Sequence, residues 1–281
     1  MSIQKILIPT DFSASAEPGV EVALAIAKNL KAEIYFFHFY EEVFELSHVP
    51  NVKNPELSPA QQTALAHIHA EMDKLVTRAR HAGLNATPIV IRNRSEEKIE
   101  EYITARQIDL VIMGTHGVRG FREFVVGSNA QYVLRHSPIP VLVVKQISDQ
   151  VEFNDILFAS RFDEDVRTPL SFILALAEVF KSTIHLLFVS SILLPTGEEN
   201  AMARIRDLIR QFPETNFSIN YSETNDEELA IDQIAREVGA DLIALTTHDH
   251  QGLLKIFSRS VAEHLANHES LPVLVIPELE H

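Results

Sequence analysis

The chain has no cysteine and no long apolar run, and both absences narrow what it can be. Without cysteine, disulfide frameworks, thiolate nucleophiles and cysteine-based zinc sites are excluded. No stretch approaches the ~20 apolar residues that a membrane helix needs. The apolar run before Pro9 is also too short for the core of a signal peptide. We therefore expect a cytoplasmic protein with no membrane partner.

Positive charge is also scarce. Lys and Arg number 24 against 39 Asp and Glu, which gives a formal net charge of −15. Such a field repels phosphate backbones, so no nucleic-acid partner is expected, although a local basic pocket for one small anion is compatible with it. With 46% apolar and 22% charged residues the composition is globular. At about 100–200 residues per domain, the 281 residues favour two domains.

What the chain does contain is an internal repeat. The segment ILIPTDF, 6–12, returns as ILFASRF at 156–162, and IDLVIMGTH, 108–116, returns as ADLIALTTH at 240–248. Repeats at such long periods indicate a duplicated structural unit. The sequence therefore predicts a first domain over 1–146 and a second over 151–278, joined by a polar linker.

The second copy is 18 residues shorter between its second and fourth predicted strands, since the offset falls from 150 to 132. The polar, proline-containing stretch 40–59 corresponds to the shorter stretch 190–200. Length changes in surface loops cost little free energy. We therefore assign most of the shortening to this one loop.

Short β-branched runs alternate with longer segments of helical period in both copies, a pattern typical of βαβ units. The strands are nearly all apolar, as expected for a parallel sheet covered on both faces. The predicted fold is α/β, with two tandem doubly wound domains, each a five-stranded parallel sheet flanked by four helices. In the first copy we expect strands at 3–9, 33–39, 87–91, 109–114 and 140–144, and helices at 14–30, 58–82, 95–106 and 127–136. Ser13 is the expected N-cap of the first helix.

Residues with binding chemistry follow the first and fourth predicted strands. Ligands of doubly wound sheets bind beyond the carboxyl ends of the strands, at the topological switch point. Thr10 and Asp11 end the first strand, and Gly114-Thr115-His116-Gly117 ends the fourth. After nine further residues, Gly127-Ser128 opens a helix. Glycines allow close backbone approach to phosphates, and helix N-terminal amides bind anions.

The full pattern is Gly-x-x-Gly, nine further residues and Gly-Ser, together with an aspartate after the first strand. This pattern resembles that of the nucleotide-binding type of the universal stress protein family. The chain resembles a tandem member of it. The resemblance implies an adenine nucleotide alpha hydrolase-like fold and one bound ATP, with or without Mg²⁺. It places Pro9, Thr10 and Asp11 at the adenosine, the main chain near Phe39 and Tyr40 at the adenine edge, and Gly114 and Gly117 at ribose and phosphates. Gly127, Ser128 and Asn129 would hold the phosphates, and Met113, His116 and Arg119 complete the expected nucleotide-binding set.

Each of these residues also has an ordinary structural interpretation. Asp11 can cap a turn or helix, Gly114 can serve turn geometry, and Ser128 can be a plain N-cap. Arg119 is as compatible with a surface salt bridge as with an anion. A catalytic role for His116 is the minor alternative, so no catalytic residue is assigned. The histidine pairs 67/69 and 248/250 have no third ligand at a suitable spacing, so no protein-held metal is expected.

The second copy has lost the pattern. Asp11 is replaced by Arg161, Gly114 by Thr246, Gly117 by Asp249 and Gly127 by Arg259, while Ser128 persists as Ser260. Side chains at the former glycines fill the space that a triphosphate would need, so ATP is not expected there. Arg161 and Arg259 either bind another anion or pair with Asp163 or Asp249 to seal the pocket, and we favour sealing.

The final strand of each copy, near 140–144 and 272–276, is apolar. An apolar edge strand needs a partner. The resemblance implies that this strand makes the dimer contact, so we expect the two copies to pair through it as an intrachain pseudo-dimer. A homodimer of whole chains is a further option.

Three functions fit the sequence. The first is an ATP-binding stress-response regulator or sensor with one ATP site in the first domain and an unknown protein partner. The second is a slow ATP hydrolase, although the chain has no Walker lysine and no placed acid–base pair. The third is a nucleotide-free interaction module whose second domain binds another ligand or protein. We favour the first, and an enzyme is the less expected outcome.

Overall fold

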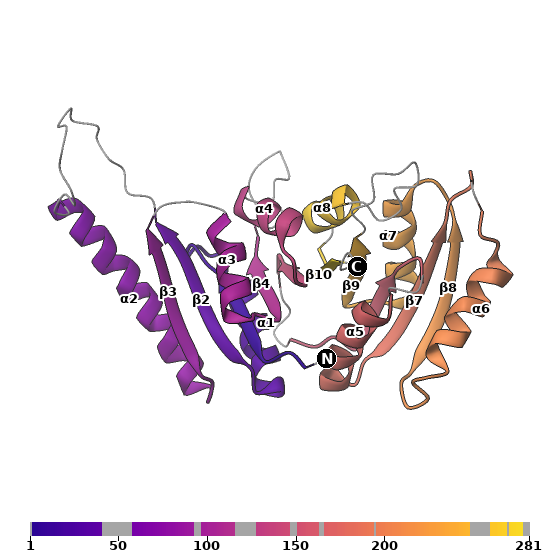
Figure 1. Ribbon diagram of the computed structural model, residues 1–281, viewed down its shortest axis with the longest axis horizontal. Coiled ribbons are helices and arrows are strands. Elements are labelled where there is room, and N and C mark those ends of the chain that lie inside the picture. Colours follow the sequence, from indigo (N-terminus) through magenta and orange to yellow (C-terminus); the bar gives the residue numbers. More distant parts are fainter. Residues whose placement is uncertain are drawn as a thin grey trace.

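A computed structural model describes residues 2–40, 58–92, 97–115, 128–146, 151–162, 166–193, 195–247, 259–268 and 270–277. Strands and helices alternate along these residues (Figure 1). The first half contains β1 (Lys5–Pro9), α1 (Glu17–Leu30), β2 (Glu33–Tyr40), α2 (Pro59–His81), β3 (Ala86–Arg92), α3 (Glu97–Arg106), β4 (Leu110–Gly114), α4 (Ser128–His136) and β5 (Val141–Val144). The second half contains β6 (Asp155–Ala159), α5 (Arg167–Phe180), β7 (Thr183–Ser190), α6 (Glu198–Ile209), β8 (Phe217–Glu223), α7 (Glu227–Val238), β9 (Leu242–Thr247), α8 (Arg259–His268) and β10 (Val273–Pro277).

The strands form one sheet in the order β3-β2-β1-β4-β5-β10-β9-β6-β7-β8. Neighbours within each half are parallel. β5 and β10 meet antiparallel, with Leu142 opposite Leu274. The structure confirms the predicted α/β class, and the final strands of the two halves do pair with each other.

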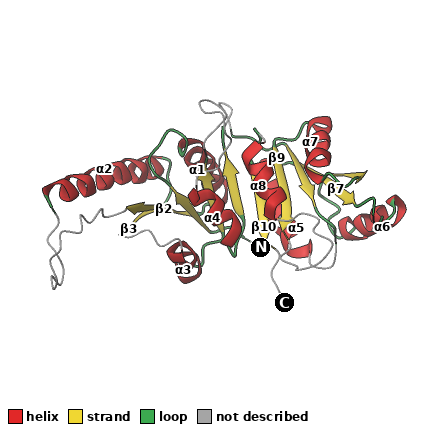
Figure 2. Ribbon diagram, turned by 90° about the horizontal axis from the view of Figure 1, so that it is seen from above, coloured by secondary structure: helices red, strands yellow, loops and turns green. Residues whose placement is uncertain are grey.

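Helices cover both faces of this sheet (Figure 2). The alternation along β2 shows the pattern: Ile34 and Phe36 pack on the face covered by α1 and α2, whereas Tyr35 and Phe37 pack on the face covered by α3 and α4. Both faces of the central strands are therefore buried, which is why those strands are almost continuously apolar. None of the helices that the structure describes is long and apolar enough to cross a bilayer.

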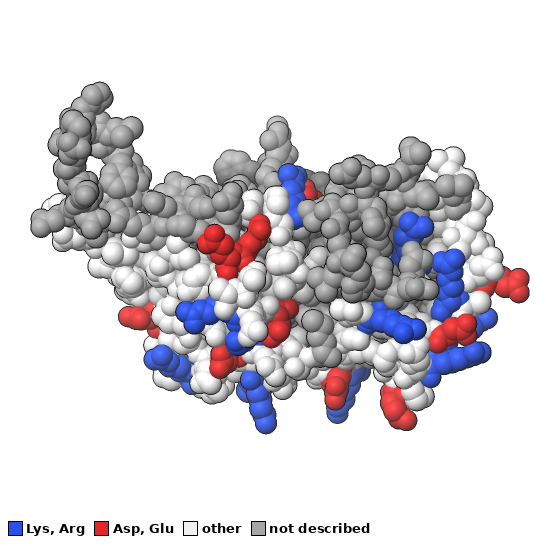
Figure 3. Space-filling view, viewed as in Figure 1, with Lys and Arg blue, Asp and Glu red and all other residues white. Residues whose placement is uncertain are grey.

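The seam between the halves is also bridged by side chains. α4 and α8 lie side by side across it (Figure 2). The guanidinium of Arg135 on α4 donates to both carboxylate oxygens of Glu263 on α8, at 2.5 and 2.7 Å. This bidentate geometry fixes the relative orientation of the two side chains as well as their distance. Elsewhere on the face in Figure 3, lysine and arginine side chains are interspersed with acidic ones.

The prediction that Ser13 caps the first helix is wrong. α1 begins at Glu17, Ala16 occupies the N-cap position, and no side chain caps it. The Ser13 hydroxyl instead donates to Asp11 Oδ1 at 2.5 Å. Pro18 fits the first helical turn because its missing N–H would have no partner there.

The assignment of the shortening mostly to one loop also needs correction. α2 has 23 residues and α6 has 12, so the helix is shortened as well as the loop before it. α2 starts as expected, since Ser58 and Gln61 form a reciprocal capping box. It buries only three of its residues, Met72, Val76 and Ala79, so its length costs little to change.

Candidate functional site

The candidate site lies where the winding of the first half reverses. β1 and β4 are neighbours, with Ile6 opposite Leu110 and Leu7 opposite Val111. α1, which follows β1, covers one face, and α4, which follows β4, covers the other. The crevice beyond such a pair of carboxyl ends is where doubly wound sheets bind ligands. The fold therefore brings Thr10 and Asp11 to the same edge as Met113 and Gly114.

A tight turn follows β1. The buried Thr10 donates its N–H to the Phe37 carbonyl at 2.9 Å, and its Oγ1 accepts from the Phe12 N–H at 3.0 Å. Phe12 has φ 63°, a left-handed conformation that non-glycine residues rarely adopt. Asp11 Oδ1 accepts from the N–H of Ser13 at 3.0 Å and from its hydroxyl. The turn role considered for Asp11 is present, and its contact with a nucleotide stays a prediction.

His38 is a site residue that sequence reasoning missed. Its Nδ1 lies 2.7 Å from the Thr10 carbonyl, and because a carbonyl only accepts, this nitrogen carries the proton. The imidazole also faces the Phe12 ring, with centroids 4.5 Å apart. A histidine within the largely apolar run EIYFFHFY was the available signal. His38 therefore holds both the main chain and the aromatic ring of the turn.

The other β2 residues lie where they were expected. Phe39 and Tyr40 are half-buried at the carboxyl end of β2, one strand away from β1. The Phe39 ring packs edge-on against the buried Phe37 ring, at 4.6 Å between centroids. This contact fixes the strand end whose main chain the resemblance assigns to the adenine edge.

Gly114 has a packing reason to lack a side chain. A Cβ added there would lie 2.3 Å from the Ser15 carbonyl oxygen and 2.7 Å from the Ala16 Cα. A Cβ on Gly19 would lie 2.3 Å from the Gly114 nitrogen. α1 therefore starts directly against the backbone of β4. Close helix packing alone accounts for glycine at 114, so this glycine does not by itself identify a nucleotide site.

Thr115, the residue after β4, carries the unexplained polar atom of the site. The residue is 3% exposed, and its N–H donates to the Val144 carbonyl at 3.0 Å. Its Oγ1 is buried and has no hydrogen-bond partner in the part of the chain that the structure describes. Burying a hydroxyl without a partner costs about 1–3 kcal/mol. A hydroxyl placed this way fits an acceptor or donor supplied by a bound molecule.

The remaining predicted residues lie wholly or partly outside the described region. His116, Gly117, Arg119 and Gly127 are not described, and neither are Asp163 and Asp249, the pairing partners considered for Arg161 and Arg259. The backbones of Ser128 and Asn129 form the first residues of α4, consistent with the expected helix N-terminus beyond β4. No group of three or more described metal-ligating side chains could hold a metal ion.

The second half keeps the turn but fills its surroundings. Ser160 Oγ accepts from the Phe162 N–H at 3.2 Å, as Thr10 does from Phe12. Phe162 is only 5% exposed and stands between Phe158 and Phe188, at 5.7 and 6.4 Å between ring centroids. Thr246, at the position of Gly114, is fully buried and donates to Ser160 Oγ at 3.3 Å. Here the aromatic rings pack near one another, and the hydroxyl groups of Thr246 and Ser160 hydrogen-bond to each other.

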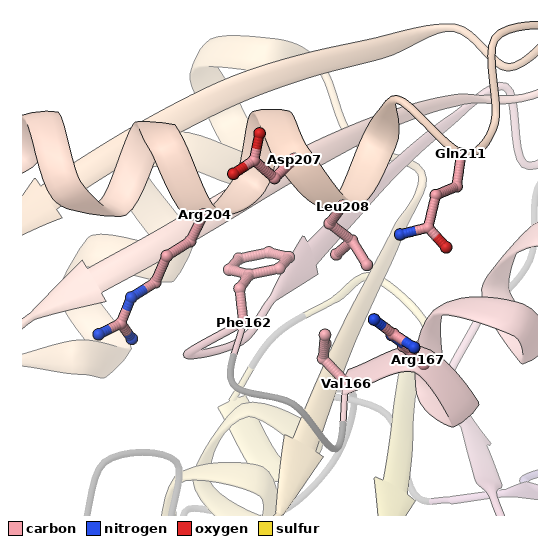
Figure 4. Close-up of a pocket in the computed structure, with 7 residues that line it drawn as sticks. All are labelled: Phe162, Val166, Arg167, Arg204, Asp207, Leu208 and Gln211. Atoms are coloured by element: carbon pink, nitrogen blue, oxygen red, sulfur yellow. The ribbon is translucent and has the colours of Figure 1, made fainter.

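A cavity of about 600 Å³ opens beside Phe162, between α5 and α6 (Figure 4). Its apolar part consists of Phe162, Val166 and Leu208, and its polar part of Arg167, Arg204, Asp207 and Gln211. It is therefore a mixed site and differs in chemistry from the crevice beyond β1 and β4.

Comparison with known proteins decides the family. The model of the universal stress protein family matches residues 2–145 and again 152–277. The chain belongs to the universal stress protein family. Universal stress protein MJ0577 of Methanocaldococcus jannaschii is 28% identical over 162 residues, which cover 51% of this chain and 95% of the relative. Universal stress protein MJ0531 of the same organism is 28% identical over 143 residues, which cover 51% of this chain and 82% of that relative.

A solved universal stress protein from Archaeoglobus fulgidus shares the fold over nearly the whole length. Its TM-score is 0.74 at 17% identity, and the match covers 99% of this chain and 100% of that one. At this identity the likeness concerns the fold alone. Two universal stress protein units in one chain thus account for the duplicated sheet.

Proposed function

We propose that this universal stress protein binds one ATP in its first half and acts in the cytoplasm as a nucleotide-dependent regulator of a stress response. In this proposal residues 1–146 form the nucleotide-binding domain, and residues 151–278 form a second domain with a degenerate motif. The two act as an intrachain pseudo-dimer that contacts a further protein.

One observation supports the proposal above the others. The motif residues that the structure describes converge on the switch point between β1 and β4, where α1 and α4 lie on opposite faces. Pro9, Thr10 and Asp11 reach it from β1, and Met113 and Gly114 from β4. Ser128 and Asn129 reach it through the N-terminus of α4, an anion-binding feature.

The hydrogen-bonding groups at this edge of the sheet also suit a nucleotide. The Thr115 hydroxyl, directly after β4, is buried and unpartnered among the described residues, so a bound molecule that reached it would gain a hydrogen bond. Bound ATP would supply the phosphates, and Mg²⁺ would accompany them. The residues of this chain would orient the adenosine beside the turn at Asp11 and the phosphates at the start of α4.

The test is mass spectrometry of small molecules released by denaturing the purified full chain, combined with a calorimetric ATP titration. We expect one ATP per chain. Gly127→Arg, which copies the residue of the second half, should abolish binding. The matched control, Arg259→Gly in the second half, should leave the stoichiometry at one.

Other results would change the assignment. Bound ADP or AMP with steady turnover would favour the slow hydrolase. A chain that purifies empty and does not respond to added ATP would contradict nucleotide binding and favour the interaction module. The cavity beside Phe162 gives that module a place for another ligand.

A further inference from the structure

Three polar side chains form a linear hydrogen-bonded cluster on the second half of the sheet, which we name the Asp–His–Ser cluster. His185 Nε2 lies 2.8 Å from Asp155 Oδ1, and His185 Nδ1 lies 2.7 Å from Ser218 Oγ. Asp155 is the first residue of β6, and His185 and Ser218 are register partners in β7 and β8. The cluster is therefore near the amino ends of the strands, remote from the carboxyl ends that form the nucleotide crevice.

The positions of the protons follow from the partners. A carboxylate only accepts, so in the neutral imidazole Nε2 carries the proton and donates it to Asp155. Nδ1 then has a free lone pair, and the Ser218 hydroxyl donates to it. This is the arrangement of a serine activated by a general base whose ring is oriented by a carboxylate. The two ring nitrogens exchange roles relative to the protease triad, but both hydrogen bonds keep their direction.

Ser218 is accessible from the side of the sheet. β8 is the last strand of the sheet, and Ser218 is half-buried on it. The His185 side chain is 12% exposed, so the base is largely shielded from water. Asn220 Nδ2 donates to Ser218 Oγ and to the Leu186 carbonyl, both at 3.3 Å. An amide N–H thus donates to the nucleophilic oxygen itself, where it stabilises the negative charge that develops as the proton moves to His185.

The first half shows that the fold does not require this cluster. Lys5 begins β1 as Asp155 begins β6, and Tyr35 pairs with Thr87 as His185 pairs with Ser218. The Tyr35 hydroxyl turns away to donate to Glu33 Oε2 at 3.0 Å. The same sheet positions are therefore filled by residues that form no such chain, and the cluster is particular to the second half.

We propose that Ser218 is a nucleophile that accepts acyl groups from small activated esters and releases them to water. Ser218 Oγ bonds to the ester carbonyl carbon while its proton passes to His185 Nδ1. The bond from carbon to the alkoxy oxygen then breaks, and His185 returns the proton to the leaving alkoxide, which departs as the alcohol. Water attacks the acyl-serine with the same base, giving the carboxylic acid and restoring Ser218, so ester and water yield acid and alcohol.

The small size of the substrate follows from the surroundings of Ser218. The residue lies on the face of the sheet that also carries His185 and Asn220, and it does not line the cavities beside α5 and α6. Because Ser218 lines neither cavity, the proposal rests on a small ester whose reactivity depends on its leaving group. The activity is independent of ATP, so its failure would leave the proposed nucleotide function untouched.

The test uses the full chain and a fluorophosphonate probe, which forms a Ser Oγ–phosphorus bond and releases fluoride. We expect one adduct per chain, mapped by peptide mass spectrometry to Ser218, and hydrolysis of p-nitrophenyl acetate above the rate in buffer. Ser218→Ala should abolish both. Ser222→Ala is the matched control, because Ser222 lies on the same face of the same strand but opposite Val189, and it should label as the parent chain does.

Three further variants separate catalysis from structural support. His185→Gln should slow labelling by at least about a hundredfold, the usual range for loss of a general base. Asp155→Asn should slow it less, and Asp155→Glu should restore part of the rate, as expected for a positioning carboxylate. An unlabelled Ser218, labelling that is equal at Ser222, or an unchanged rate in His185→Gln would each overturn the proposal.

Discussion

The carboxyl ends of β1 and β6 show how one fold supports two different surfaces. Both strands lead into a turn in which a hydroxyl accepts from the N–H two residues on, and Phe12 and Phe162 both have left-handed φ values of 63° and 52°. Beyond the turn the halves diverge. The first half places His38 against Phe12, whereas the second places Phe188 near Phe162.

The divergence extends to the neighbouring strand. Gly114 lets α1 lie directly against the end of β4, while Thr246 occupies this position in the second half and bonds to Ser160. The turn belongs to the fold, because both copies keep it. The chemistry around it differs between the halves, with a histidine against the turn in the first and buried aromatic rings in the second.

The largest expected effect comes from adding a side chain at Gly19, where α1 lies directly against the end of β4. In Gly19→Ala the new Cβ would lie 2.3 Å from the Gly114 nitrogen and 2.6 Å from the Met113 carbonyl carbon, so α1 must move. We expect the free energy of unfolding to fall by about 3 kcal/mol, the upper range for overpacking. Urea unfolding followed by circular dichroism measures the loss, and hydrogen exchange should place it in β1 and β4.

The matched control for this variant is Gly239→Ala in the second half. No atom lies within 4 Å of the new Cβ there, but φ is 67°, so only backbone strain of about 1–2 kcal/mol is expected. A loss for Gly19→Ala no larger than for Gly239→Ala would show that the close contact of α1 with β4 is not the constraint.

The next effect concerns the unpartnered hydroxyl. Thr115→Val removes the buried Oγ1 with almost no change of shape, so stability should change little or rise. If the hydroxyl bonds to the nucleotide, ATP affinity should fall about tenfold, equivalent to about 1.4 kcal/mol. Isothermal titration calorimetry measures the affinity. Unchanged affinity together with a loss of stability would assign Thr115 to a structural role.

The same replacement in the second half should give the opposite result. Thr246→Val removes a hydroxyl that bonds to Ser160, and Thr246 is fully buried. We expect the free energy of unfolding to fall by about 1 kcal/mol, with ATP stoichiometry unchanged. Thermal unfolding with and without ATP distinguishes the two variants. If Thr246→Val instead reduced ATP binding, nucleotide binding could not be confined to the first half.

Much of the fold followed from the sequence, because a two-sided parallel sheet needs apolar strands such as those of β1, β4 and β6. The pairing of β5 with β10 was expected from the apolar final strands together with the resemblance, which implies that this strand makes the dimer contact. The start of α1 did not follow, since Ser13 bonds within the turn instead of capping the helix. The closeness of Gly19 to Gly114 and the contact of His38 with Thr10 were invisible as well, because they join residues far apart in the sequence.

The smallest expected effect concerns the longer second helix of the first half. Arg78 on α2 pairs with Glu17, at 2.5 Å, and with Glu21, which ties α2 to α1. Arg210 in the second half pairs instead with Asp207, three residues away in its own segment. Burial lowers the pKa of Arg78, but its hydrogen bond to Glu17 and the charges of both glutamates outweigh this, so the pKa lies above its ordinary value.

A group with a raised pKa contributes stability that is fully present below its ordinary pKa and is lost only as the pH rises through the raised value, so the tie should be complete at neutral pH. Arg78→Met, which keeps the apolar stem, should lower the free energy of unfolding by about 0.5–1 kcal/mol at low salt and by less in 1 M NaCl. Arg210→Met serves as the control and should leave the urea midpoint unchanged. An equal loss for both variants, or a salt-independent loss for Arg78→Met, would show that the ion pair between α1 and α2 does not distinguish the halves.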